Sequence, residues 1–189
     1  MFNALPIMAT ALSLRVQMYN ANTTAQINTI FPWFKITNTG SIPVNLAEVK
    51  IRYYYTIDGE KPQNFWCEWS DIDTKKITGS FVKLETPFSG ADHYFELGFK
   101  TGAGTLQPGQ SVAVHSRFAK NDWSYYDQTD DYSFNPTAKT YVDWDKITVH
   151  IGSAITTSHD YANDGQWVNQ PVTIRLTAAG GSGSLTTYY

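Results

Sequence analysis

Hydrophobic and polar residues alternate along five separate runs of the chain. The runs lie at residues 12–18, 49–55, 95–99, 112–118 and 147–151. With the exception of Ser116, apolar side chains recur at every second position, so they would gather on one face of an extended strand. The pattern predicts half-buried β-strands with one face toward a core and the other toward solvent.

Turn-forming residues separate these runs. Gly, Pro, Asn, Asp and Ser cluster at residues 38–41, 58–59, 89–92 and 107–109. The sequence has no amphipathic helix of convincing length, which argues against the crossover helices of a parallel α/β fold. Many short strands with frequent turns predict an all-β chain, folded as an antiparallel β-sandwich with jelly-roll topology.

The strand pattern indicates one sandwich over residues 12–152, which is long enough to bury a sizeable core. Residues 1–11 are mildly apolar but lack the basic and hydrophobic regions of a signal peptide, and are interpreted as an added or partial leader. Residues 153–189 are too few for an independent core. They are expected to form a linker plus either an extra strand or a truncated neighbouring domain, since WVNQPVTIRLTA resembles the opening of bacterial Ig-like repeats.

Composition narrows the possible partners. The 14 basic and 17 acidic residues give a net charge of −3, and no run of Lys or Arg is present. Nucleic acid and charged membranes are disfavoured because both are bound through clustered basic residues, and no segment is apolar enough to span a bilayer. Cys67 is the single cysteine, which excludes an intrachain disulfide. The 6 Trp, 12 Tyr and 10 Phe residues suit an uncharged ligand that stacks on flat rings, such as a neutral sugar.

Three longer strings carry a family resemblance. They are IRYYYTIDGEKPQNFWCEW at 51–69, GSFVKL at 79–84 and SRFAKNDWSYYDQTDDYSF at 116–134. In this order, over residues 12–152, they resemble a family 3 carbohydrate-binding module. The resemblance implies a secreted bacterial module, without catalytic activity, that binds cellulose or a related plant cell-wall polysaccharide. It also implies attachment to a catalytic, scaffold or sensor domain.

The resemblance further implies a structural Ca²⁺ site between two loops. The residues that match it are Thr56, Asp58, Asp127, Asp130 and Asp131. Physically, three carboxylates within residues 127–131 repel one another unless a hard cation with oxygen ligands joins them. The alternative is a solvated acidic loop in which Asp side chains cap turns.

A strip of exposed aromatic and polar side chains is implied in the same way. Arg117 and Trp123 match two members of this strip. The pair Glu68-Trp69 stands where the family has Asp-His, and the short loop at 70–79 lacks a further aromatic residue of the family. Trp69 therefore either replaces that ring or the strip is shorter. If Cys67 is buried, strand alternation places Trp69 inside as well, which conflicts with a binding role.

Two other interpretations stay open. Without a working strip, the chain would be a packing partner of a catalytic domain or an extracellular module that senses polysaccharide. Tyr19, Arg52 and Tyr54 are expected together in a shallow groove on the opposite sheet, or else on a solvated face with paired Tyr residues. An enzyme is not indicated, because neither paired catalytic carboxylates nor a metal-binding His spacing can be identified.

Overall fold

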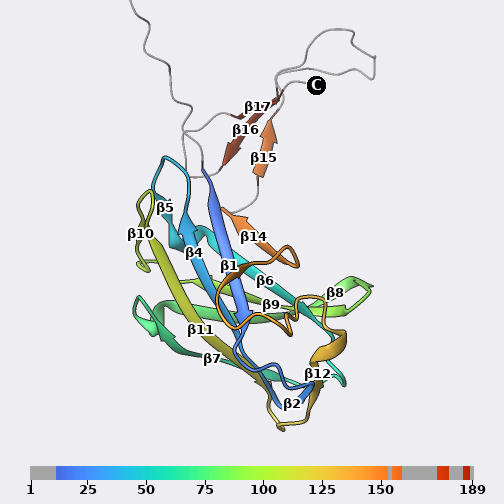
Figure 1. Ribbon diagram of the computed structural model, residues 1–189. Helices are drawn as coiled ribbons and strands as arrows, with labels where there is room; N and C mark the ends of the chain where they lie inside the picture. Colours follow the sequence, from blue (N-terminus) through green and yellow to red (C-terminus); the bar gives the residue numbers. More distant parts are fainter. Residues whose placement is uncertain (1–11, 153–154, 159–173, 179–184, 188–189) are drawn as a thin grey trace, which may run out of the picture. The chain divides into compact units, whose positions relative to one another are not determined.

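The computed structural model describes residues 12–152 and the strands at 155–158, 174–178 and 185–187 (Figure 1). Contacts within the chain divide it into two units, residues 1–150 and 151–189. The expected leader at 1–11 lies outside the described residues. Nowhere in the described part of the chain does a helix reach the length and apolar content needed to cross a membrane.

One sheet of the first unit is built around its longest member, β11, and is called the β11 sheet below. In spatial order its strands are β13 (Val142–Asp143), β1 (Leu14–Asn20), β4 (Pro32–Asn38), β11 (Ser111–Lys120) and β7 (Gln63–Ser70), with β3 (Thr29–Ile30) beside the same edge of β11 as β4. Their pairings are antiparallel throughout. β7 and β11 therefore form one end of this sheet, and their outer faces lie side by side (Figure 1).

The second sheet, called the β9 sheet, packs against the first. Its order is β14 (Ile147–Ile151), β6 (Val49–Tyr55), β9 (Ala91–Phe99) and β8 (Ile77–Phe88). The chain crosses repeatedly between the sheets, for example from β6 to β7 and from β7 to β8. The predicted antiparallel β-sandwich with jelly-roll topology is thus confirmed.

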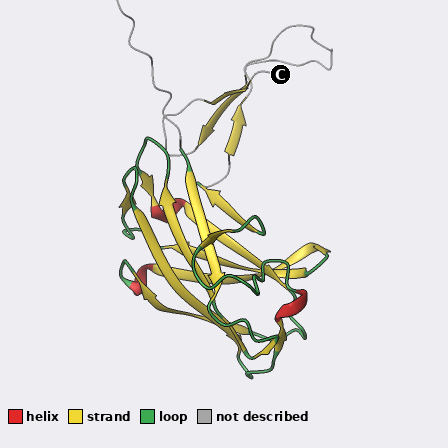
Figure 2. Ribbon diagram, in the orientation of Figure 1, coloured by secondary structure: helices red, strands yellow, loops and turns green. Residues whose placement is uncertain are grey.

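Short elements occupy the connections between the long strands (Figure 2). They are the paired strands β2 (Gln26–Ile27) and β12 (Tyr126–Asp127), the paired strands β5 (Val44–Asn45) and β10 (Thr105–Leu106), and the 3₁₀ helices η1 (Leu46–Glu48), η2 (Thr74–Lys76) and η3 (Gln128–Asp130). The pairing of β2 with β12 anchors the segment that carries three of the acidic candidates.

The second unit contains an antiparallel sheet of β15 (Ile155–Ser158), β16 (Ile174–Ala178) and β17 (Leu185–Thr187). β16 lies within the stretch WVNQPVTIRLTA. The rest of the tail, on which the Ig-like resemblance depends, lies outside the described residues.

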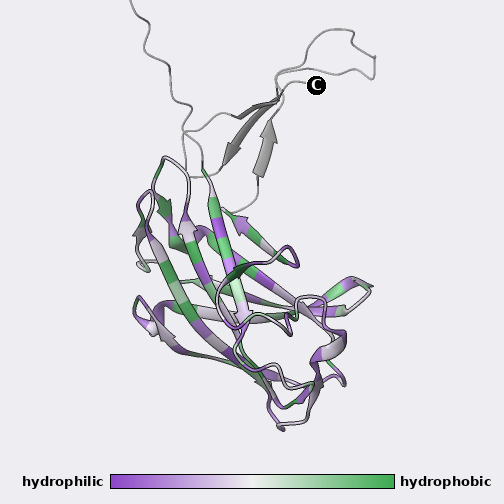
Figure 3. Cartoon of the chain, in the orientation of Figure 1, coloured by the Kyte–Doolittle hydropathy of each residue, from purple (hydrophilic) through white to green (hydrophobic). Residues whose placement is uncertain are grey.

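Aromatic rings from both sheets meet at Phe118, which is fully buried. Its ring centroid lies 5.0 Å from Tyr55, 5.1 Å from Phe95 and 5.9 Å from Tyr126. Hydrophobic and hydrophilic residues alternate along the strands as predicted (Figure 3). The period-two pattern therefore sends one face of each sheet into a shared core, where burial of apolar surface stabilises the sandwich.

Gly79 marks a point of close approach between the sheets. A Cβ atom at this position would lie 2.3 Å from the ring of Phe65 on β7 and 2.7 Å from Phe95 on β9. Those two rings pack together with centroids 5.4 Å apart. A glycine in β8 is thus required by packing, because any side chain would push the two rings apart.

Removal of the central ring should destabilise the sandwich strongly. For Phe118→Ala we expect a loss of about 3–5 kcal/mol in the free energy of unfolding, since the ring is buried and leaves a cavity. Phe88→Ala removes the same atoms from a side chain that is 44% exposed, and should cost clearly less. Urea unfolding followed by circular dichroism measures both; equal losses would contradict the central role of Phe118.

Candidate functional site

The pairing of β7 with β11 contains an irregularity at Glu68. Ser116 of β11 lies opposite Cys67 of β7. The next residue of β11, His115, lies opposite Trp69, so the register shifts by one residue. Glu68 is therefore the extra residue of a β-bulge, a feature that redirects side chains locally.

This bulge decides where Trp69 points. In a regular strand Trp69 would share the inner face with Cys67. The extra residue reverses the alternation, so Trp69 takes the outer face beside His115 and is 47% exposed. Glu68 is exposed as well. The predicted conflict between a buried Cys67 and an exposed Trp69 is thereby resolved.

Arg117 and Glu68 form the polar centre of the outer face. Arg117 Nε donates to Glu68 Oε1 over 2.6 Å. The guanidinium of Arg117 also lies 4.3 Å above the ring of Trp66. Because a guanidinium stacks on an indole while it hydrogen-bonds a carboxylate in plane, these contacts hold Arg117 in one orientation.

Trp66 extends this group toward Trp123, which is 49% exposed. The two rings are almost parallel, with an interplanar angle of 12° and centroids 5.9 Å apart. The sequence did not single out Trp66. It lies directly opposite Arg117 on the neighbouring strand, so both side chains are on the same face of the sheet. Tyr125, exposed by 59%, was also missed. Trp66 therefore contacts two of the four predicted residues, Arg117 and Trp123.

Trp123 has an unusual backbone. Its φ of 58° lies in the left-handed region, which costs on the order of 1–3 kcal/mol for a bulky residue. Its N–H donates to the carbonyl of Lys120 over 3.0 Å. Beside it, Asp122 accepts from the hydroxyl of Ser124 over 2.7 Å. The turn that follows β11 is therefore held by its own hydrogen bonds in the conformation that exposes the indole.

A second group of rings crosses the outer face from Trp69 toward β1. His115 lies 4.7 Å from Trp69 and stacks on Trp33 at 3.6 Å, measured between ring centroids. Tyr19 packs edge-on against Trp33 at 5.4 Å, and the Tyr141 hydroxyl lies 3.1 Å from His115 Nε2. Burial lowers the pKa of His115, so its ring is neutral near pH 7.

Tyr19 does not join Arg52 and Tyr54, contrary to the predicted groove. Tyr19 belongs to β1 of the β11 sheet, whereas the other two lie on β6 of the β9 sheet. Arg52 donates to Glu96 over 2.9 Å and lies 4.4 Å above the ring of Tyr94. The grouping was wrong because sheet membership cannot be read from residue type.

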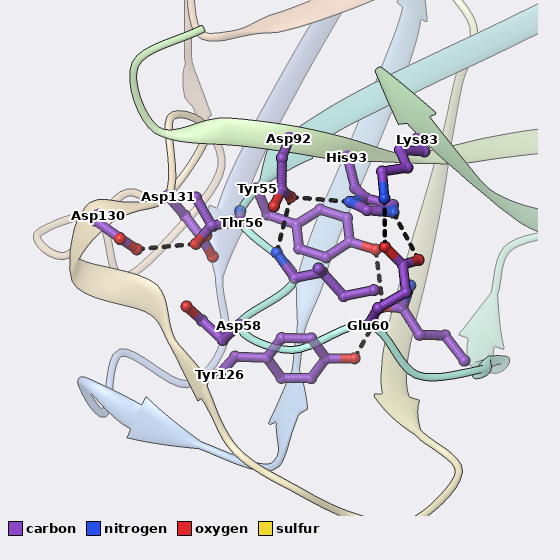
Figure 4. A network of polar contacts seen from close by, with 12 residues as sticks. Tyr55, Thr56, Asp58, Glu60, Lys83, Asp92, His93, Tyr126, Asp130 and Asp131 are labelled. Atoms are coloured by element: carbon purple, nitrogen blue, oxygen red, sulfur yellow. Dashed lines mark hydrogen bonds and ion pairs between the residues drawn. The ribbon is translucent and has the colours of Figure 1, made fainter. Parts of the chain in front are cut away.

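The acidic candidates meet where the end of β6 faces the segment around η3 (Figure 4). Thr56 donates from its backbone N–H to Asp131 Oδ1 over 2.8 Å, and from its hydroxyl to Asp130 Oδ1 over 3.0 Å. Asp131 is 5% exposed, and its Oδ2 is buried with no hydrogen-bond partner among the residues that the structure describes. A buried carboxylate oxygen of this kind needs a proton or a cation.

The side chain of Asp58 contacts the backbone of Asp127. Asp58, with a φ of 51°, accepts the N–H of Asp127 at its Oδ2 over 2.7 Å. The Asp127 carboxylate caps η3 by accepting the N–H of Thr129 over 3.0 Å, and it also accepts from the Thr129 hydroxyl over 2.6 Å. Asp127 therefore joins the cluster through its main chain, while its carboxylate has a local partner.

Burial opposes the ionisation of two carboxylates in this acidic cluster, those of Asp131 and Asp58. Burial, with further contributions from the charges of Asp130 and Asp58, raises the pKa of Asp131 to about 8. Burial likewise raises the pKa of Asp58. Within the described residues, no three His, Cys, Asp or Glu side chains form a metal-binding group. The oxygens that face one another include the Thr56 hydroxyl, so the donor set is that of a hard cation rather than a soft one.

Two neighbouring features hold the cluster in place. Gly90 accepts the N–H of Tyr132 over 2.7 Å, and a Cβ atom on Gly90 would lie 2.6 Å from the Asp130 carbonyl oxygen. On the other side, Asp92 accepts the N–H of Ile57 over 2.9 Å and contacts His93 over 2.8 Å (Figure 4). The turn between β8 and β9 thus supports both halves of the acidic cluster.

Comparison with known proteins connects these features to a family. Residues 15–157 match a family model described as a cellulose binding domain. The chain is 55% identical over 138 residues to exoglucanase-2 of Thermoclostridium stercorarium, and 46% identical over 143 residues to anti-sigma-I factor RsgI4 of Acetivibrio thermocellus. These alignments cover 73% and 76% of this chain but 15% and 27% of the relatives.

A solved structure shares the fold. It is the CBM3b of the major scaffoldin subunit ScaA from Acetivibrio cellulolyticus, with a TM-score of 0.72 and 51% sequence identity. The match covers 73% of this chain and 90% of that one. The similarity therefore spans the sandwich, whereas each of the two longer relatives carries much additional chain.

The raised pKa of Asp131 predicts a pH dependence in metal-free protein. Because the folded-state pKa of about 8 exceeds the ordinary value of 3.8, the neutral acid stabilises the fold below the ordinary value. This contribution is lost as the pH rises through about 8, so the melting temperature should fall across that window. Asp131→Asn should flatten the dependence, and Asp143→Asn, on the exposed carboxylate paired with Arg15, should leave it intact. An unchanged slope in Asp131→Asn would contradict the assignment.

Proposed function

Because the chain belongs to the family 3 carbohydrate-binding modules, we propose that it binds cellulose through the outer face of β7 and β11. The family is one of binding domains, and the chain is a non-catalytic module. The single observation that carries the proposal is the pair of exposed indoles, Trp69 and Trp123, on the strand and turn next to the Arg117–Glu68 ion pair. Together with Trp66, these residues are called the binding strip below.

The chemistry of the binding strip suits a chain of neutral sugars. A glucose ring presents C–H groups that pack on an indole face, and such stacking contributes about 1–3 kcal/mol per ring by analogy with nucleobases. One ring binds weakly, but several rings engage successive sugars while the entropy of association is lost only once. Between the rings, Arg117 and Glu68 offer a donor and an acceptor for sugar hydroxyls.

Calcium is the second part of the proposal. Thr56, Asp58, Asp130 and Asp131 would hold the ion through side-chain oxygens, with Asp127 contributing at the edge of the site. Support comes from the buried Asp131 Oδ2, which has no hydrogen-bond partner within the described part of the chain, and from the raised pKa values of Asp131 and Asp58. A bound Ca²⁺ supplies positive charge that neutralises these carboxylates and joins the end of β6 to the η3 segment.

The biological setting follows from the relatives. An exoglucanase, an anti-sigma factor and a scaffoldin subunit all carry a similar sandwich. We propose that this chain is secreted and serves as the polysaccharide-binding part of such a protein, attached to a catalytic, scaffold or sensor domain. A strip-deficient packing module is disfavoured, since Trp69 and Trp123 are about half exposed, at 47% and 49%.

Loss of either exposed indole should weaken binding to cellulose. For Trp69→Ala and for Trp123→Ala we expect at least a fivefold lower affinity for microcrystalline cellulose, the loss that corresponds to about 1 kcal/mol or more per ring. Depletion isotherms measure the affinity. Phe88→Ala is the matched control, because that ring is similarly exposed, at 44%, but lies on the β9 sheet. Wild-type protein that stays in solution, or unchanged binding by both Trp variants, would refute the proposal.

Calcium should stabilise the fold. At a calcium concentration of about 100 times the Kd, the ion contributes about 2.7 kcal/mol, which corresponds to roughly 5–10 °C in the melting temperature. Chelation should remove this increase in melting temperature from the wild type. The melting temperature of Asp131→Ala should be the same in calcium and in chelator. Asp143→Ala should keep the full increment. If exhaustive chelation leaves the melting temperature of the wild type unchanged, the calcium part of the proposal is wrong.

A further inference from the structure

Two loops with left-handed backbones lie at the same end of the sandwich. Asp58, in the connection from β6 to β7, has a φ of 51°, and Trp123, in the turn after β11, has a φ of 58°. Among the described residues these are the non-glycine positions with positive φ. Such conformations persist only where surrounding contacts hold them.

Lys120 supplies those contacts. It is the last residue of β11 and is 1% exposed, although lysine is almost never fully buried without partners. Its ammonium donates to the carbonyl of Asp58 over 2.7 Å and to the carbonyl of Tyr125 over 2.9 Å. It also lies 4.6 Å from the centroid of the Tyr126 ring. One side-chain nitrogen therefore ties the Asp58 loop to the turn that presents Trp123.

Main-chain hydrogen bonds connect Trp123 to the same anchored turn. The Lys120 carbonyl accepts the N–H of Trp123 over 3.0 Å, and the ammonium holds Tyr125 on the far side of the same turn. A second link joins the two loops, because Asn121 donates its N–H to the Pro62 carbonyl over 2.9 Å. The turn is thus fixed at both ends against the β6–β7 connection.

We propose that Lys120 is a positioning residue of the binding strip, which fixes the exposed indole of Trp123 by anchoring its turn to the Asp58 loop. This inference rests on the proposed cellulose binding. Lys120 itself is buried and touches no sugar, so it acts only through Trp123. A buried methionine of similar length would keep the packing of the stem but leave two carbonyls without their donor.

A double-mutant cycle tests the proposal. Lys120→Met should lower the affinity for microcrystalline cellulose by about fivefold or more, up to the loss seen for Trp123→Ala. In the Trp123→Ala background the same change should cause no further loss, since its effect passes through the missing ring. Lys100→Met, at an exposed lysine, is the control and should bind as the wild type does. Equal losses in both backgrounds would overturn the proposal.

Fluorine NMR of protein labelled with 5-fluorotryptophan tests, without cellulose, whether Lys120 fixes the position of the Trp123 ring. Lys120→Met should shift or broaden the Trp123 resonance, assigned by its absence from Trp123→Phe, and leave the Trp69 resonance in place. An unmoved Trp123 signal would overturn the proposal even if the wild type did not bind cellulose, so the two failures are distinguishable. Should Lys120→Met not fold, Lys120→Arg should move the same signal, because a planar guanidinium cannot reproduce the two bonds of the ammonium.

Discussion

The pairing of β7 with β11 is the constraint on which the outer face depends. Over most of its length the pairing is regular and places Arg117 opposite Trp66. At Glu68 a single extra residue reverses the alternation, so the second half of β7 turns Trp69 to the outside. Without this bulge, Trp69 would share the inner face of β7 with Cys67, because side chains alternate along a regular strand. The bulge therefore joins two aromatic groups on one side of the sheet.

Rigidity of this face follows from how its side chains hold one another. Arg117 is fixed by Glu68 in its plane and by Trp66 beneath it. The backbone of Trp123 is fixed by its hydrogen bond to the Lys120 carbonyl, and the ring of Trp69 packs against His115. Rings that are already ordered lose little conformational entropy on binding, which favours a weakly interacting, uncharged polymer. The low overall charge of the chain is consistent with such a ligand, since no electrostatic attraction is available to assist it.

The acidic cluster and the Trp123 end of the binding strip lie at the same end of the sandwich. Asp58 belongs to the loop that carries the proposed calcium ligands, and its backbone carbonyl accepts from Lys120. The residue after the Lys120-anchored turn, Tyr126, begins the strand that leads to Asp127 and η3. The loop of Asp58 and the turn of Trp123 are therefore held by the same side chain, Lys120.

The sequence by itself determined the fold class and the positions of five strands. Alternation with period two and the spacing of turns are local signals, so they predicted β1, β6, β9, β11 and β14. The order of the motifs also singled out Arg117 and Trp123, and the structure places both on one face. The convergence of Thr56, Asp130 and Asp131 was anticipated too, because the motif match linked two segments that are distant along the chain.

Only the tertiary structure decided how the strands relate to one another. Alternation tells which residues of one strand share a face, but not which strand lies next to it or where the register slips. For that reason the orientation of Trp69, the place of Tyr19 and the role of Trp66 all required the β11 sheet to be assembled. The same holds for Lys120, because one of its two carbonyl partners, that of Asp58, is 62 residues away in the chain. These features arise from contacts between distant segments, and such contacts exist only once the two sheets have closed on their common core.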